Sequence, residues 1–235
     1  MSDARPEKAP EFDAYAHDYK DLLRDPLREK FAGENLFFAE QKLQVIRSFF
    51  RSLGRDTQSL NWLDVGCGFG ELLRMGRPMF ASVSGCDPAK EMLRGCGDLD
   101  VLLQPSHLQI PFNSSSFDFV TAVCVYHHIP VEQRSIMTAE IARVARPGGI
   151  LALIEHNPWN PVTRLIVSRT PIDRNAVLLT AGECKRLVRD AGATVVSTRY
   201  FLVLPKPIYK HASWVETGLA SLPLGGQYAV FSQLR

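Results

Sequence analysis

The stretch at residues 63–70 reads Leu-Asp-Val-Gly-Cys-Gly-Phe-Gly. It follows Leu60 and Trp62, as expected for a short buried strand that ends in a turn. Glycines at such a turn permit a tight backbone and let the main chain approach a ligand. The next apolar run ends in Asp87, 21 positions after Gly66. An acid at that distance suits the hydroxyls of a ribose, although an ordinary glycine turn also fits the motif alone.

The spacing of the glycines indicates which class of ligand the turn can bind. Gly66, Gly68 and Gly70 lack the G-x-G-x-x-G pattern that accommodates a pyrophosphate. Glu71 adds a negative charge at the following helix N-terminus, where a diphosphate would sit. These features favour a nucleoside ligand without phosphates, and S-adenosylmethionine fits this description.

Apolar runs of strand length alternate with helical patterns along the chain. Strands are predicted at 60–65, 81–87, 99–104, 117–125, 150–155, 194–200 and 227–234, with helices at 36–53, from 71, at 89–96, 131–145, from 180 and near 211–221. This alternation predicts a doubly wound, seven-stranded, mostly parallel α/β sheet. The last strand follows a connection without a full crossover helix, so we predict that it runs antiparallel. We expect a single domain over 1–235, with an N-terminal lid segment at 12–35 and substrate-side insertions at 156–179 and 201–225.

Composition predicts the class of partner. The net charge is +2, 46% of residues are hydrophobic and 22% are charged, with no block of lysine and arginine. We therefore expect no nucleic-acid partner and no stable membrane insertion. Five cysteines without a CxxC pair indicate reduced thiols, and the polar N-terminus indicates a cytoplasmic enzyme. The oligomeric state is left open.

Several stretches in a fixed order resemble the class I S-adenosylmethionine-dependent methyltransferases, and among them the type 11 small-molecule group. They are residues 63–70, 85–88 with 92–93, 110–112 with 116–118, 126–129 and 143–151, together with a lid-like segment at 12–19. The resemblance implies a Rossmann-like fold, S-adenosylmethionine as cofactor and methyl transfer as the reaction.

The resemblance also implies cofactor contacts. The backbones of Gly66 and Gly68 would face the methionyl group, and Asp64 would steady the loop or reach the ammonium. Asp87 would bind the ribose, and Pro88 would lie against the adenine. Two alternatives remain from the residues alone, because Asp64 also fits a turn and Asp87 also fits a helix N-cap.

Four further cofactor contacts implied by the resemblance lie outside the glycine turn and the Asp87–Pro88 pair. The family usually has an aspartate at the place of Ser106, which is followed by His107. Serine is a weaker acceptor, so adenine recognition would use backbone groups near His107. Cys124 would offer its carbonyl to the methionyl ammonium, and Tyr19 would close over the cofactor unless it is a core aromatic.

Polar side chains follow the fourth and fifth predicted strands, where a ligand of an open α/β sheet binds. The catalytic candidates are His127, His128, Glu155 and His156. We rank His127 first as base because imidazole titrates near neutral pH, and Glu155 or His156 second. The two adjacent histidines also fit structural strand-end positions. No third ligand at a suitable spacing accompanies the glutamate–histidine pair, so no metal is predicted.

The acceptor is predicted to be a small molecule. Nucleic-acid amino methylases carry an Asn/Asp-Pro-Pro-aromatic tetrad after strand four, whereas residues 124–127 read Cys-Val-Tyr-His. The two insertions combine aromatic residues with a few cations, which suits an apolar or aromatic acceptor with an anionic group, unless they only pack onto the sheet. A non-catalytic S-adenosylmethionine-binding module and, less favoured, a nicotinamide-dependent oxidoreductase remain as alternatives.

Overall fold

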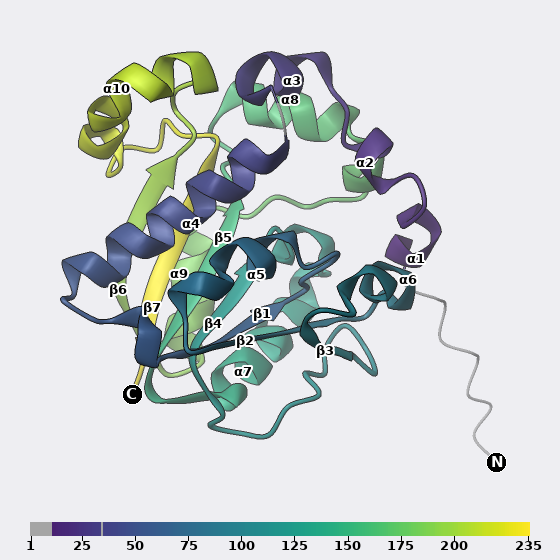
Figure 1. Ribbon diagram of the computed structural model, residues 1–235, viewed down its shortest axis with the longest axis vertical. Coiled ribbons are helices and arrows are strands. Elements are labelled where there is room, and N and C mark those ends of the chain that lie inside the picture. Colours follow the sequence, from purple (N-terminus) through teal and green to yellow (C-terminus); the bar gives the residue numbers. More distant parts are fainter. Residues whose placement is uncertain (1–10, 34) are drawn as a thin grey trace.

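A computed structural model describes residues 11–33 and 35–235 of the chain (Figure 1). Its centre is one seven-stranded sheet of order β3-β2-β1-β4-β5-β7-β6. The strands are β1 (Asn61–Val65), β2 (Ser82–Asp87), β3 (Asp100–Leu103), β4 (Phe117–Val123), β5 (Ala145–His156), β6 (Ala193–Phe201) and β7 (Gln227–Leu234). Only β7 is antiparallel to its neighbours β5 and β6. The predicted doubly wound sheet with an antiparallel last strand is confirmed.

Helices cover both faces of the sheet. They are α1 (Glu11–Tyr15), α2 (Tyr19–Leu22), α3 (Pro26–Ala32), α4 (Asn35–Ser52), α5 (Glu71–Gly76), α6 (Lys90–Leu93), α7 (Arg134–Val144), α8 (Pro161–Arg169), α9 (Ala181–Asp190) and α10 (Lys206–Leu219). One apolar cluster joins α4 and α5 to the sheet, and another joins α7 and α9 to it. Because both faces are covered, the central strands are apolar almost throughout.

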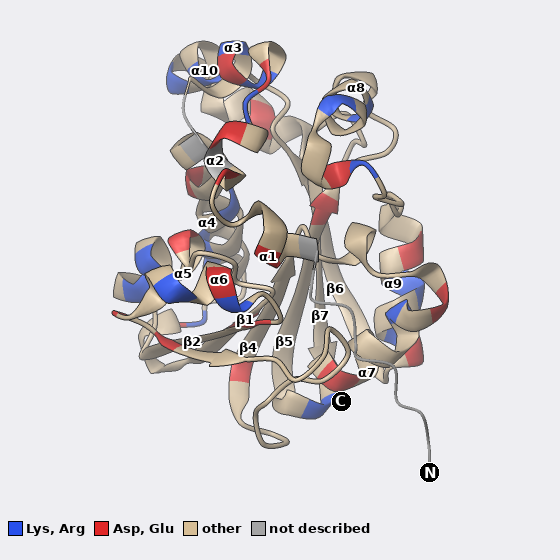
Figure 2. Cartoon of the chain, turned by 90° about the vertical axis from the view of Figure 1, so that its right-hand side faces the viewer, with Lys and Arg blue, Asp and Glu red and all other residues tan. Residues whose placement is uncertain are grey.

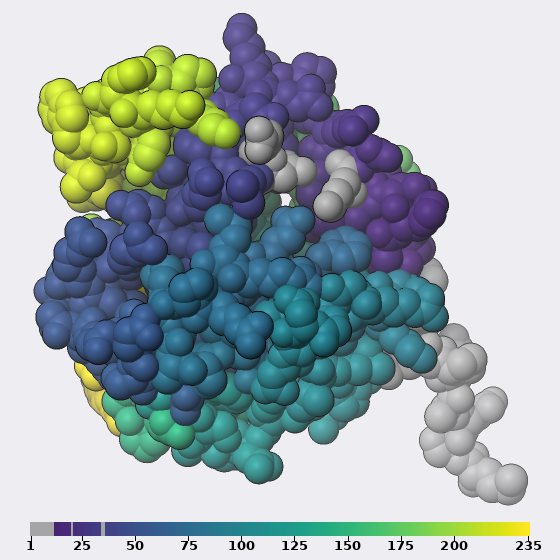
Figure 3. Space-filling view, viewed as in Figure 1, coloured from purple at the N-terminus to yellow at the C-terminus, as the bar shows by residue number. Residues whose placement is uncertain are grey.

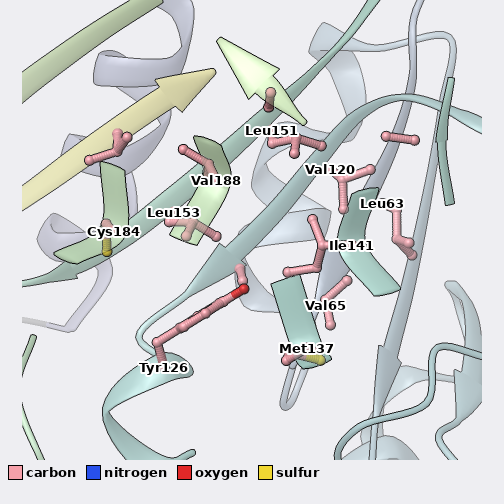
Figure 4. Packing of buried hydrophobic residues seen from close by; sticks show 14 of the residues in the cluster. Leu63, Val65, Val120, Tyr126, Met137, Ile141, Leu151, Leu153, Cys184 and Val188 are labelled. Carbon is pink, nitrogen blue, oxygen red and sulfur yellow. The ribbon is translucent and has the colours of Figure 1, made fainter. Parts of the chain in front are cut away.

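The two clusters use alternate residues of each strand. Leu151 and Leu153 of β5 pack in the α7–α9 cluster, where Figure 4 shows them near Val188. Ile150 and Ile154 face the other way, into the cluster of α4. There the rings of Phe49 and Phe231 are stacked with centroids 4.0 Å apart, which fixes α4 against β7.

The structure differs from the prediction in the start of strand β5 and in the presence of a helix in the first insertion. Strand β5 begins at Ala145, because the Arg-Pro-Gly-Gly segment continues it through a register shift opposite Phe117–Phe119. The insertion 156–179 contains α8, which was not predicted. Asn160 caps this helix by accepting a hydrogen bond from the backbone N–H of Thr163 at 2.9 Å. Pro161 then occupies the first helical position, where its missing N–H is tolerated.

The N-terminal helices and the two insertions lie at the carboxyl edge of the parallel strands. Figure 1 shows α3, α8 and α10 above the sheet, and Figure 3 shows the purple N-terminal helices beside yellow-green α10 on the surface. The segment predicted as a lid and the two insertions thus border the switch point between β1 and β4, where open α/β sheets bind ligands. Residues 1–10 and 34 of the predicted domain lie outside the described residues. In the described residues, no helix is both long and apolar enough to cross a bilayer.

Candidate active site

The glycine turn after β1 needs its glycines. Gly66, Gly68 and Gly70 have φ angles of 74°, 53° and 71°, in the left-handed region. A Cβ atom on Gly66 would lie 2.5 Å from a methyl group of Val125. The backbone N–H of Gly66 donates to the carbonyl of Cys86 at 2.8 Å, which anchors the turn to β2. The turn can therefore expose its backbone to a ligand without a side chain in the way.

Asp87 ends β2 with its carboxylate already shared between two backbone donors. It accepts from the N–H of Gly68 at 2.9 Å and from the N–H of Ala89 at 2.8 Å. Helix α6 has Ala89 as its N-cap residue, so Asp87 is not the helix cap that the sequence left open. Burial raises the pKa of Asp87, while these two hydrogen bonds oppose the shift. The carboxylate joins the glycine turn to the second strand and lines the cavity beside it.

Asp64 is held by a chain of hydrogen bonds across two strands. The indole N–H of Trp62 donates to the hydroxyl of Thr121 at 2.8 Å, and that hydroxyl donates to the Asp64 carboxylate at 2.5 Å. Burial raises the pKa of Asp64 to about 7, against the hydrogen bond from Thr121 and the charge of Lys42. Asp64 is thus a fixed acceptor facing the cavity.

This shift predicts how stability depends on pH. With a folded pKa near 7 and an unfolded pKa near 4, the native state binds the extra proton between these values. The free energy of unfolding should therefore fall as pH rises from about 4 to 7, by up to about 4 kcal/mol from this group. Asp64→Asn should remove this part of the decline. Urea unfolding of both proteins without ligand, at pH 5 and pH 8, measures the difference, and equal declines would contradict the assignment.

A cavity of about 720 Å³ lies over the glycine turn. All nine predicted cofactor contacts line it: Tyr19, Asp64, Gly66, Gly68, Asp87, Pro88, Ser106, His107 and Cys124. The ring of Tyr19 meets that of Phe69 edge-on at 5.6 Å, so α2 lies against the glycine turn. His107 is tied by its Nε2 to the side chain of Gln133 at 2.7 Å. The structure brings into one hollow residues that span more than a hundred positions of the chain.

A second cavity of about 280 Å³ adjoins the first. Tyr19, Arg28, Lys42, Cys124 and His128 line both, so the two form one continuous hollow. The remaining walls of the smaller cavity combine apolar side chains of α8 and of the segment after β6 with polar ones, among them His127, His156 and Asp173. We name this smaller space the inner cavity.

Glu155 is fully buried and does not line either cavity. It accepts hydrogen bonds from the backbone N–H groups of Val125 and Tyr126, at 2.9 and 2.7 Å. Its other oxygen lies 2.6 Å from Nδ1 of His127. Burial alone would raise the pKa of Glu155, but the charge of His127 and these hydrogen bonds lower it. Glu155 therefore holds the turn after β4 and orients His127, which does not suit its predicted role as base.

His127 lies between two carboxylates. Its Nε2 lies 3.6 Å from Asp173, on the opposite side of the ring from Glu155, and only 2% of the residue is exposed. Burial alone would lower the pKa of His127, but the two carboxylates outweigh it and raise that pKa to about 10. A ring that already carries its proton at neutral pH does not suit the predicted role of base.

The other two histidines stay neutral beside this charge. Burial, with the charge of His127, lowers the pKa of His128 to about 4 and that of His156 to about 3. The ring of His128 meets that of Phe12 edge-on at 4.8 Å. Nδ1 of His156 lies 3.4 Å from the side-chain amide of Gln227. Of the four predicted catalytic residues, only His128 lines both cavities.

Sequence reasoning missed four residues of the site. Arg28 and Lys42 bring cations to both cavities, and Asp173 and Gln227 line the inner one. The Oε1 atom of Gln227 is buried and has no hydrogen-bond partner among the described residues. None of these residues belongs to a local motif, and only the packing of α3, α4, α8 and β7 brings them together.

The comparisons with known proteins agree with this geometry. Residues 63–153 match the family model of the methyltransferase domain. The tRNA (carboxymethyluridine(34)-5-O)-methyltransferase of Arabidopsis thaliana is 27% identical over 117 residues, 49% of this chain and 28% of that protein. The 27-O-demethylrifamycin SV methyltransferase of Amycolatopsis mediterranei is 35% identical over 101 residues, 39% of this chain and 36% of that protein. A solved S-adenosylmethionine-dependent methyltransferase of Thermotoga maritima, a possible histamine N-methyltransferase, has a TM-score of 0.68 at 17% identity and covers 95% of this chain and 98% of its own.

These relatives correct one prediction. The chain spans about a quarter of the Arabidopsis tRNA methyltransferase and a fifth of the bovine probable tRNA methyltransferase 9B, which is 35% identical over 94 residues. Because these relatives are tRNA methyltransferases, the prediction that excluded a nucleic-acid partner was wrong. Figure 2 shows acidic and basic residues interspersed over α5, α6 and α9. This mixed distribution does not indicate which class of acceptor the protein binds. The family match identifies residues 63–153 as a methyltransferase domain that uses S-adenosylmethionine, and the sheet topology and the solved structures show that the chain has the class I methyltransferase fold.

Proposed function

We propose that this enzyme transfers the methyl group of S-adenosylmethionine to an apolar or aromatic acceptor group that enters the inner cavity. The continuity of the two cavities carries this proposal. A donor in the larger cavity, with its ribose at Asp87 and its methionyl end at Gly66 and Cys124, would direct its methyl group toward the shared walls. The acceptor would then approach from the inner cavity.

The residues of this site contribute to the reaction by aligning the acceptor's nucleophile with the methyl group of the cofactor. The cofactor's sulfonium supplies a methyl group with a good, neutral leaving group, so orientation of the nucleophile decides the rate. We assign this task to His128, because it lines both cavities and its ring is fixed against Phe12. Arg28 and Lys42 provide positive charge on the same walls, which suits an anionic group on the acceptor.

Two kinds of acceptor are consistent with these walls. Ligand pockets commonly have volumes of about 300–1,000 Å³, so the inner cavity of about 280 Å³ suits a small molecule or one end of a larger one. A small-molecule acceptor is the first candidate because the cavity is small and about half of its lining residues are apolar. A tRNA is the second candidate, and the tRNA methyltransferases among the relatives are the observation that favours it.

Calorimetry and labelled methyl transfer test the proposed function. S-adenosylhomocysteine should bind one equivalent per chain, and NAD should give no heat, because the glycine turn lacks the pyrophosphate spacing. S-adenosylmethionine with a radioactive methyl group should label either an organic extract of small metabolites or a tRNA fraction. Absence of binding at millimolar S-adenosylhomocysteine would contradict the proposal, and binding without any labelled product would favour the non-catalytic module.

A further inference from the structure

Three ligand-type side chains meet on one wall of the inner cavity. One ring nitrogen of His127, one ring nitrogen of His128 and one carboxylate oxygen of Asp173 all lie within 4.8 Å of one another. The histidines belong to the 3-10 turn Tyr126–His128 after β4, and the aspartate ends the 3-10 turn Pro171–Asp173 after α8. The cluster thus joins the end of the parallel sheet to the insertion that roofs the cavity.

We propose that His127, His128 and Asp173 bind one divalent transition-metal ion of the zinc type, with an open coordination position toward the inner cavity. Two imidazole nitrogens and one carboxylate oxygen are a ligand set that zinc and its neighbours in the first transition row accept. The metal site itself stands on these contacts alone. Its use in holding an oxygen or nitrogen of the acceptor rests on the proposed function.

The distances within the cluster fit a shared ion better than direct hydrogen bonds. The Asp173 oxygen lies 3.6 Å from Nε2 of His127 and 3.4 Å from Nε2 of His128. Charge-assisted hydrogen bonds are shorter, about 2.7–2.9 Å. Tetrahedral ligands with bonds of about 2.0–2.1 Å lie about 3.4 Å from one another. These two separations are therefore close to the edge length of a tetrahedron around a single ion.

The surroundings of His127 have the arrangement that supports a metal ligand. A ligating histidine usually donates its second ring N–H to a carboxylate, which fixes the tautomer and the ring plane. Glu155 takes this place at 2.6 Å from Nδ1, and two backbone N–H groups hold Glu155 in turn. Binding of the ion would displace the second proton of this ring, and the lone pair of Nε2 would then point toward Asp173.

The insertion that carries the third ligand is anchored to the same turn. The backbone N–H of Val177 donates to the carbonyl of His127 at 2.8 Å, and the guanidinium of Arg134 donates to the carbonyl of Val177. Asp173 lies four residues before this anchor, with only 10% of its side chain exposed. All three ligands line the inner cavity, so a bound ion would present its open position to the acceptor.

Titration of the metal-stripped full-length chain tests this site. After treatment with EDTA, Zn²⁺ should bind with one equivalent per chain in calorimetry. Asp173→Asn should weaken this binding more than about 100-fold, since it removes a ligand but keeps the shape of the side chain. Glu155→Gln should weaken it about 10–100-fold, as for other partners of ligating histidines. The amide of the glutamine side chain would donate to Nδ1 of His127. The ring proton would then stay on Nε2, the atom that is proposed to bind the metal.

Matched controls and a spectrum exclude other zinc sites. His211→Gln and Asp190→Asn change an exposed histidine and an exposed aspartate on α10 and α9, and both should bind Zn²⁺ as the wild type does. Co²⁺ in place of Zn²⁺ should show the visible bands of a four-coordinate site without the near-ultraviolet band of thiolate ligation, which tests the five cysteines.

The outcomes separate this proposal from the proposed function. Equal Zn²⁺ affinity in Asp173→Asn and wild type, or no stoichiometric binding, would overturn the metal site. S-adenosylhomocysteine titrated into the same variants reports the cofactor cavity independently. Its binding without Zn²⁺ binding would leave the methyltransferase proposal intact, whereas loss of both in a variant with a wild-type circular dichroism spectrum would place Asp173 in the support of the whole site and overturn its assignment as a metal ligand.

Discussion

Replacement of Glu155 by alanine should lower the free energy of unfolding by about 3–5 kcal/mol. Removing one partner of a buried, paired charge has this cost because the other partner stays behind unpaired. Here the loss leaves three buried donors without an acceptor: the backbone N–H groups of Val125 and Tyr126, and Nδ1 of His127. Since these donors belong to the turn after β4, the loss also disorders the turn that carries His128 on the lining of both cavities. Urea unfolding with a circular dichroism signal measures the change.

Two further variants show that the effect belongs to this position. Glu132→Ala, on the exposed turn before α7, should change the free energy of unfolding by less than about 0.5 kcal/mol. Glu155→Gln should fall between it and the alanine variant, because one amide oxygen can still accept from both backbone N–H groups. If Glu155→Ala unfolds like the wild type, the carboxylate does not stabilise the turn as its contacts indicate.

The sequence predicts the topology because local patterns carry it. Apolar runs such as Phe117–Val123 and the stop signals between them predict the strands. The direction of β7 was predicted correctly from an expected lack of a full crossover helix, although α10 (Lys206–Leu219) does lie in that connection. The placement of β7 between β5 and β6 depends on pairing between strands far apart in the chain, which local patterns do not predict. The capped helix α8 was missed because its signal, Asn160 before Pro161, is only two residues long and lies in a proline-rich stretch.

The cofactor side of the site could also be predicted, because local sequence patterns define it. The glycine turn and Asp87 are a motif with a fixed spacing, so the sequence alone brings them together. The acceptor side has no such spacing. Asp173 lies 45 and 46 positions after His128 and His127, and Gln227 lies 103 positions after Cys124. The choice of His127 as base relied on the usual pKa of imidazole, which the buried carboxylates on both sides of the ring change.

Replacement of Asp87 by alanine should weaken the binding of S-adenosylhomocysteine by about 1.5–3 kcal/mol, roughly 10–150-fold in the dissociation constant. This range is typical of hydrogen bonds to a charged group. The carboxylate lines the larger cavity at the end of β2, where a ribose is expected. Each oxygen accepts one backbone hydrogen bond and keeps a further lone pair for a hydroxyl group. Calorimetric titration of the folded variant measures the loss.

The same substitution should also reduce stability, because Asp87 has two duties. Without the carboxylate, the N–H groups of Gly68 and Ala89 lose their acceptors, at a cost of about 1–3 kcal/mol for each group that stays buried and unpaired. Affinity must therefore be measured well below the unfolding temperature of the variant. Asp190→Ala, an exposed carboxylate at the end of α9, serves as the control and should leave both quantities unchanged. A variant at Asp87 that loses stability but keeps its affinity would show that the carboxylate only shapes the glycine turn, and the ribose would then be bound by backbone groups alone.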